Sequence, residues 1–353
     1  MGRLLACLLA LIVALPGRGE APAAQVVPGR AFSFPADHGA HPDYRTEWWY
    51  VTGWLQVEGK ALGFQITFFR SRMDGQDANP SRFAPRQILI AHAAISDPAR
   101  GRLLHDQRVA RAGFGLAEAA TGAAEIALDG WRFEQAGEGF AAVIPAREFH
   151  LDLNFAPTQP PLLQGEKGYS RKGPRPGAAS YYYTLPHLGV TGTLTRDGRT
   201  QVVTGEAWLD REWSSQYMDE DAEGWDWVGL NLDDGGALMA FRMRRKGGGT
   251  LWAGGTLRRK NGDVTVFRPD EVQFDARRVW RSPRTGASYP VALQLRAGTL
   301  DLDLEPLMDD QENDTRLSTG TIYWEGAVTA RADARPVGRG YLELTGYWRR
   351  MGL

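Results

Sequence analysis

The feature that most constrains the fold of this chain is an alternation of apolar and polar residues with a period of two. It is clearest at residues 61–69, where every second side chain is large and apolar: Leu62, Phe64, Ile66 and Phe68. Because successive side chains of a β-strand point to opposite faces, the pattern predicts a strand with one buried face. Residues 48–57 form a similar run, and the turn at 58–60 joins the two runs into a β-hairpin.

A similar hairpin is expected in the second half of the chain, at residues 225–232 and 237–243. A shift of 177 positions superimposes these pairs: Trp48 and Trp225, Tyr50 and Trp227, Leu55 and Leu232, Phe64 and Phe241. The match predicts that one β-barrel was duplicated. The alternative is a single large β structure that contains two similar hairpins by convergence.

Further short strands are expected throughout, and apolar residues at helical spacing are hard to find outside residues 114–120. The expected strands cover residues 87–95, 125–133, 149–155, 189–196 and 201–209. Residues 156–179, rich in proline and glycine, are expected to form a long ordered loop of the kind that is often functional. The fold class is therefore all-β. Closure into barrels removes exposed sheet edges, and barrels of about eight strands can hold one small ligand.

The first residues have the order of a secretory signal peptide. Arg3 precedes an apolar run at 4–15, and small residues follow at 21–24. We expect cleavage after about residue 24 and a periplasmic or extracellular location. Cys7 is the only cysteine, so the mature chain would have no disulfide and no thiolate site. A lipid-attachment site at Cys7 is disfavoured because the apolar run follows the cysteine.

Composition argues against several classes of function. The net charge is −1, with acids and bases interspersed, so the basic surface of a nucleic-acid binder is missing. The six histidines form neither a His-x-His pair nor a His-Glu-x-x-His motif, which argues against a catalytic zinc. No serine-nucleophile elbow or phosphate-binding glycine motif has the required context. We expect no cofactor and no metal.

Several strings resemble a known secreted family. They are EWWYVTG at 47–53, AHAAISD at 91–97, GEAWLDREWSS at 205–215, GWDW at 224–227, YWEG at 323–326 and GYLELTGY at 340–347. Together they resemble the carotenoid 1,2-hydratases (hydroxyneurosporene synthases) and AttH-like "predicted secreted hydrolases", over about residues 32–347. The resemblance implies two tandem lipocalin-like antiparallel β-barrels, at 28–215 and 216–353, with a binding site near their junction and no cofactor.

The hydratase branch is expected to protonate an isoprenoid double bond and to add water to the resulting cation. Such chemistry needs a protonated carboxylic acid in an apolar pocket and aromatic faces that stabilise the cation. Asp210 and Glu212, on one face of a strand, are acids of the right type, and Trp208 and Trp213 flank them. The hydratase motif reads Asp-His-Asn-Trp-Gly, whereas residues 210–214 read DREWS, so the family's histidine is missing.

The candidate residues can each be interpreted in two ways. The catalytic candidates are Asp210, Glu212 and His92, and the ligand-binding candidates are Glu47, Trp48, Trp49, Tyr50, Trp208, Trp213, Trp225 and Trp227. Alternatively, the aromatics are barrel core, Glu47 pairs with an arginine, and residues 210–213 form an ion-pair network joining the barrels. His92, a lone histidine in an apolar strand, would then be a core residue with its hydrogen bonds satisfied.

Three functions follow from these interpretations. The first is a carrier of a lipophilic molecule, isoprenoid or fatty, which predicts an apolar cavity whose acids are all paired. The second is a hydratase, which predicts that Asp210 or Glu212 faces that cavity without an arginine partner, because a salt bridge to Arg211 would hold it ionised. The third is a structural partner of an exported or membrane transporter complex, which predicts filled barrels and an exposed apolar patch.

Overall fold

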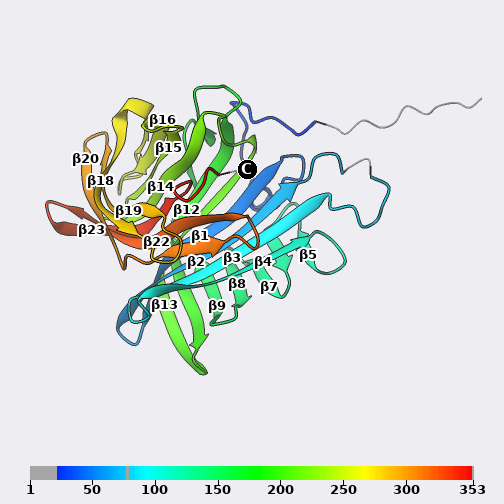
Figure 1. The fold of residues 1–353 in the computed structure, drawn as a ribbon, viewed down its shortest axis with the longest axis horizontal. Helices are drawn as coiled ribbons and strands as arrows, with labels where there is room; N and C mark the ends of the chain where they lie inside the picture. The colour runs from blue at the N-terminus through cyan, green and yellow to red at the C-terminus, as the bar shows by residue number, and fades with distance from the viewer. Residues whose placement is uncertain (1–21, 77–78, 352–353) are drawn as a thin grey trace, which may run out of the picture.

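The computed structural model describes residues 22–76 and 79–351, in which the chain folds into antiparallel β-strands (Figure 1). The described residues also include two short 3-10 helices, η1 (Ala36–His38) and η2 (Pro269–Glu271). No helix of this part of the chain is long and apolar enough to cross a membrane. The all-β prediction is confirmed. The predicted signal peptide, residues 1–24, lies outside the described residues apart from 22–24.

The first sheet has 13 strands. They are β1 (Thr46–Val57), β2 (Lys60–Arg72), β3 (Gln87–Asp97), β4 (Arg102–Arg111), β5 (Ala117–Ala119), β6 (Glu125–Leu128), β7 (Trp131–Ala136), β8 (Gly139–Pro145), β9 (His150–Ala156), β10 (Leu162–Leu163), β11 (Tyr169–Arg171), β12 (Ala179–Arg196) and β13 (Arg199–Gln216). Their order is β4-β3-β2-β1-β13-β12-β9-β8-β7-β6-β5, and β10 and β11 pair with β12.

The second sheet has 10 strands. They are β14 (Ala222–Leu232), β15 (Ala237–Arg245), β16 (Thr250–Arg258), β17 (Val264–Phe267), β18 (Val272–Arg281), β19 (Ser288–Ala297), β20 (Leu300–Pro306), β21 (Glu312–Thr315), β22 (Thr321–Ala332) and β23 (Arg335–Leu344). Their order is β17-β16-β15-β14-β23-β22-β20-β19-β18, and β21 pairs with β22.

The two sheets follow the same plan. In each, the first strand lies between the second and the last, so β1 is flanked by β2 and β13, and β14 by β15 and β23. The registers agree as well, because Tyr50 pairs with Asp210 and Trp227 pairs with Glu343. The chain is thus two tandem lipocalin-like barrels, and the two hairpins matched in the sequence occupy equivalent places.

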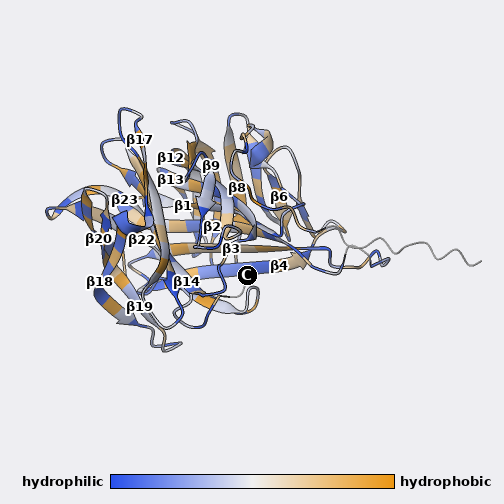
Figure 2. Ribbon diagram, turned by 90° about the horizontal axis from the view of Figure 1, so that it is seen from above, coloured by the Kyte–Doolittle hydropathy of each residue, from blue (hydrophilic) through white to orange (hydrophobic). Residues whose placement is uncertain are grey.

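Each barrel has its own apolar core, and a third apolar cluster lies between them. Figure 2 shows hydrophilic and hydrophobic residues alternating along many of the strands, as a sheet packed on one face requires. The barrels approach closely at Gly63 of β2. A Cβ atom there would lie 2.6 Å from the Cβ of Ala327 and 2.8 Å from the hydroxyl of Tyr341, both in the second barrel.

Some local expectations were wrong. Residues 125–133 form two strands, β6 and β7, because Asp129 and Gly130 between them both adopt the positive φ of a tight hairpin turn. Residues 114–120, the one segment with helical spacing, contain the short strand β5. The expected loop at 156–179 also carries strands β10 and β11.

Candidate functional site

Strand β13 divides the candidate residues between two environments, since its side chains alternate between the interior of the first barrel and the junction. Leu209 and Trp213 belong to the core of the first barrel, whereas Trp208 belongs to the cluster between the barrels. Asp210 and Glu212 share the face of Trp208, as the strand pattern predicted. Arg211 lies on the interior face, next to Trp213.

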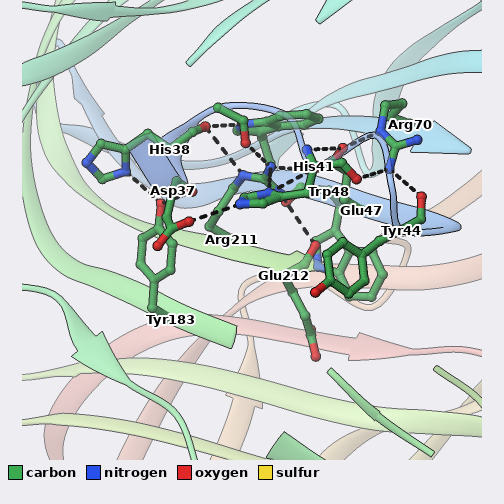
Figure 3. A network of polar contacts seen from close by, with 12 residues as sticks. Asp37, His38, His41, Tyr44, Glu47, Trp48, Arg70, Tyr183, Arg211 and Glu212 are labelled. Atoms are coloured by element: carbon green, nitrogen blue, oxygen red, sulfur yellow. Dashed lines mark hydrogen bonds and ion pairs between the residues drawn. The ribbon is translucent and has the colours of Figure 1, made fainter. Parts of the chain in front are cut away.

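The interior group is an ion-pair network around Glu47 (Figure 3). Glu47 is fully buried and forms ion pairs with both Arg70 and Arg211. The backbone N–H of His41 donates to its carboxylate at 2.9 and 3.0 Å. Burial alone would raise the pKa of Glu47, but the charges of Arg211 and Arg70 hold it well below its usual range. Glu47 therefore stays ionised and is a poor proton donor.

Two candidate tryptophans pack around this network. The Arg211 guanidinium lies 3.8 Å from the ring centroid of Trp49, whose indole N–H donates to the carbonyl of His38 at 2.8 Å. Trp213 stacks on the His41 ring with centroids 3.8 Å apart. Glu47, Trp49 and Trp213 thus lie inside the first barrel, apart from the other ligand-binding candidates.

Asp210 occupies the junction and is only 3% exposed. Its carboxylate accepts three hydrogen bonds, from the Tyr182 hydroxyl at 2.6 Å, the Thr184 hydroxyl at 2.5 Å and the Trp208 indole N–H at 2.8 Å. The indole N–H of Trp227, from the second barrel, donates to the Tyr182 hydroxyl at 3.0 Å. This contact leaves the Tyr182 proton free to point at Asp210, so both barrels build the site.

Asp210 is present in both its protonated and its ionised form near neutral pH. Burial raises its pKa to about 7, although the hydrogen bonds from Thr184, Tyr182 and Trp208 oppose the rise. Among residues 22–76 and 79–351, no arginine, lysine or histidine acts as its ionic partner. An acid whose pKa lies near the working pH can both give and take a proton, which is the property that general acid–base catalysis needs.

Glu212 is different, because it has a cationic partner. The Lys172 ammonium lies 2.8 Å from its carboxylate, and Ser180 also donates to it. Burial raises the pKa of Glu212 and the charge of Lys172 opposes that rise. Lys172 is itself buried, with its ammonium 4.4 Å from the Phe241 ring centroid and 4.7 Å from that of Tyr182. This pair matches the ion-pair interpretation of the motif.

The remaining aromatic candidates lie in the cluster between the barrels. Tyr50 contacts Trp227 edge-on with ring centroids 5.3 Å apart, and Trp208 lies 6.3 Å from Trp227. Trp48 and Trp225 each pack edge-on against Tyr217. The junction is therefore a packed aromatic cluster made by both barrels. A cavity of about 210 Å³ lies beside Trp208, and its lining includes Trp54, Asn231 and Arg339 but neither Asp210 nor Glu212.

His92 bridges the barrels at another point. One ring nitrogen lies 2.9 Å from the Tyr323 hydroxyl and the other lies 2.9 Å from the Ser318 hydroxyl. Burial lowers the pKa of His92 to about 3, so the ring is neutral. It makes no hydrogen bond with Asp210 or Glu212 within the described chain. Both nitrogens are engaged, as in the core interpretation.

The described residues contain no group of three or more His, Cys, Asp or Glu side chains that could hold a metal ion. Four acids nevertheless lie on the walls of the junction: Asp210, Glu212, Glu325 and Glu343. The sequence analysis did not single out Glu325 and Glu343. Both lie in strings that it quoted, but the shift of 177 residues does not align them with Asp210, and only the strand register relates Glu343 to Asp210.

The AttH-like family profile matches residues 25–347. The chain belongs to this family. A crystal structure of a protein assigned as AttH from Nitrosomonas europaea is 54% identical, with a TM-score of 0.87 over 92% of this chain and 99% of that chain. This relationship confirms the resemblance seen in the sequence.

Two more distant structures share the fold. Kievitone hydratase from Nectria haematococca is 15% identical, with a TM-score of 0.67 over 90% of this chain and 94% of that one. The protein CghA is 14% identical, with a TM-score of 0.54 over 95% of this chain and 98% of that one. No curated protein matches the sequence.

Proposed function

We propose that this AttH-like protein is a cofactor-independent hydratase that adds water to a carbon–carbon double bond of a lipophilic molecule held at the junction of the two barrels. The observation that carries the proposal is Asp210, a buried acid that has no cationic partner among the described residues and is set among aromatic rings from both barrels. The substrate class that suits such aromatic surroundings is an isoprenoid or another largely apolar alkene.

The chain itself provides a comparison for this interpretation. At Glu47, a buried acid with a structural role, two arginines form ion pairs with the carboxylate and hold it ionised. At Asp210 the donors within the described part of the chain are neutral, and burial raises the pKa of the carboxyl to about 7. Because a carrier does not need an acid poised in this way, the contrast favours an enzyme.

The chemistry requires a proton to reach one carbon of the double bond and water oxygen to bond to its neighbour. The second proton of that water then returns to the protein, so that the net reaction is addition of one water. Asp210 is the group through which we expect protons to pass. The rings of Trp208, Trp227 and Tyr50 supply negative faces that stabilise positive charge on the substrate. The shared fold with kievitone hydratase supports hydration chemistry.

We also infer that the protein acts outside the cytoplasm, from the signal peptide expected at residues 1–24. N-terminal sequencing of the periplasmic or secreted protein should find a start near Ala24 or Gln25. Intact Met1 in that fraction would refute this inference. An association with a membrane transporter complex remains a prediction from the sequence.

The proposed activity can be tested on protein purified from its own host. Native mass spectrometry identifies a co-purifying lipophilic molecule, and incubation in ¹⁸O-labelled water with an organic extract of the host then reports hydration. We expect a product to which one molecule of ¹⁸O-labelled water has been added. A lipophilic molecule that is bound and released without label would establish a carrier instead.

A further inference from the structure

A second group of acids, buried Glu325 and half-buried Glu343, lies across the junction from Asp210. Glu325 of β22 and Glu343 of β23 are directly opposite each other in an antiparallel pair, so their side chains share a face. That face is the junction face, since Ala327 and Tyr341 of the same strands belong to the cluster between the barrels. Two carboxyl groups are thus placed side by side where the two barrels meet.

No cation neutralises this pair within the described part of the chain. Glu343 accepts a hydrogen bond from the indole N–H of Trp225 at 2.9 Å. The hydroxyls of Tyr50 and Tyr323 lie close to Glu325. One carboxyl oxygen of Glu325 and the hydroxyl of Tyr50 are nevertheless buried without a hydrogen-bond partner of standard geometry. Buried polar atoms of this kind are rare and call for an explanation.

Like charges so close in an apolar site cannot both be present. Burial raises the pKa of Glu325 well above its usual value, and the neighbouring Glu343 raises it further. Burial raises the pKa of Glu343 to about 7. The pair therefore holds at least one proton at neutral pH, whereas Asp210 accepts three hydrogen bonds that favour its ionised form.

The internal repeat relates the two acid sites. In the shared register, Glu343 takes the place of Asp210, because they pair with the equivalent residues Trp227 and Tyr50. Glu325, opposite Glu343, takes the place of the residue opposite Asp210, which is Thr184. The second barrel thus has two acids where the first has an acid and a hydroxyl.

The contacts across the junction are also reciprocal. Trp227 of the second barrel donates to Tyr182, which in turn donates to Asp210 of the first. Tyr50 of the first barrel lies close to Glu325 of the second. Each acid site is therefore completed by an aromatic residue of the other barrel, and both lie on the junction faces of their sheets.

We propose that the Glu325–Glu343 pair is a second proton-transfer site, which gives a proton to the double bond while Asp210 takes one from the attacking water. The inference rests on the proposed hydratase function and divides its two proton transfers between the barrels. The proton of the pair forms the new C–H bond, and the water oxygen bonds to the adjoining carbon. The second water proton goes to the Asp210 carboxylate and later passes through solvent to the pair, which restores both sites.

The protonation of the pair can be tested without a substrate. Infrared titration of the full mature chain at neutral pH should show the C=O stretch of a protonated carboxyl. Asp210, whose pKa is also raised, contributes to the same region, so the spectra are compared in an Asp210→Asn background. There we expect the double variant Glu325→Gln with Glu343→Gln to lose the intensity of at least one protonated carboxyl. Glu134→Gln, the same change at an exposed strand position, should leave the intensity unchanged. An Asp210→Asn spectrum without the signal, or an undiminished signal after the double substitution, overturns the proposal.

The catalytic role is tested with an organic extract of the host in ¹⁸O-labelled water. If wild type incorporates label, Glu343→Gln should lower kcat by about 10²–10⁴-fold with little change in KM, and Glu343→Asp should restore part of the rate. Full activity in Glu325→Gln and Glu343→Gln overturns the second site and leaves the hydratase function standing. Absence of labelling in wild type refutes the hydratase function, and the catalytic role with it, even if the infrared signal is present.

Discussion

Replacing Asp210 with asparagine should change how the stability of the protein depends on pH. Burial raises the pKa of Asp210 from 3.8 to about 7 in the folded state. The folded protein therefore binds a proton at this site that the unfolded chain has released, over the range between the two values. Stability from this group is full below about pH 4 and is lost as the pH rises through about 7. About three pKa units correspond to a loss of about 4 kcal/mol.

Asparagine does not titrate, so the variant does not lose this stability. Between about pH 4 and pH 8 the unfolding free energy of Asp210→Asn should therefore rise by about 4 kcal/mol relative to that of wild type. Urea denaturation at several pH values, followed by tryptophan fluorescence, measures this difference. The other titrating acids act on both proteins and largely cancel. The unfolding free energy of the control variant Glu134→Gln should change with pH as that of wild type does. A constant difference between Asp210→Asn and wild type would refute the assigned pKa.

Three further outcomes follow from the structure. Arg211→Met removes one of the two cations at Glu47 and should lower the unfolding free energy by about 3–5 kcal/mol in urea titrations. Gly63→Ala places a methyl group against the second barrel and should cost about 1–3 kcal/mol in the same assay. Burial lowers the pKa of His187, but the hydrogen bond to Glu206 raises it more, so the pKa lies above its usual value of 6.5. The stability that this contact gives the folded protein is therefore lost as the pH rises through the raised pKa. His187→Gln should weaken that dependence.

Much of the architecture was accessible from the sequence because it depends on local patterns. Alternation identifies strands, and the repeat from Trp48 to Trp225 indicates two equivalent hairpins. The split at residues 125–133 was missed although Asp129-Gly130 is a turn signal in the sequence, and the positive φ of both residues confirms a tight turn there. The short strands β10 and β11, of two and three residues, are too short for an alternating pattern to show them, and they exist because they pair with β12.

The candidate site was predicted only in part, for a physical reason. Alternation placed Asp210 and Glu212 on one face, but it could not say which had a cation nearby, since Lys172 approaches from a distant loop. In the same way, the sequence left Glu47 open between a ligand-binding residue and the partner of an arginine, and the fold places it between two arginines. Charge environments are tertiary properties, whereas strand faces are local ones.

The most direct test of the central claim is the rate at which the Asp210→Asn variant hydrates the substrate that ¹⁸O labelling identifies. We expect kcat to fall by about 10²–10⁴-fold with little change in binding, because proton transfer typically contributes that much to the rate. We also expect the rise of the wild-type rate with pH through about 7, which reflects ionisation of the proton acceptor Asp210, to disappear in the variant. A variant that keeps the wild-type rate and the same pH profile would contradict the account.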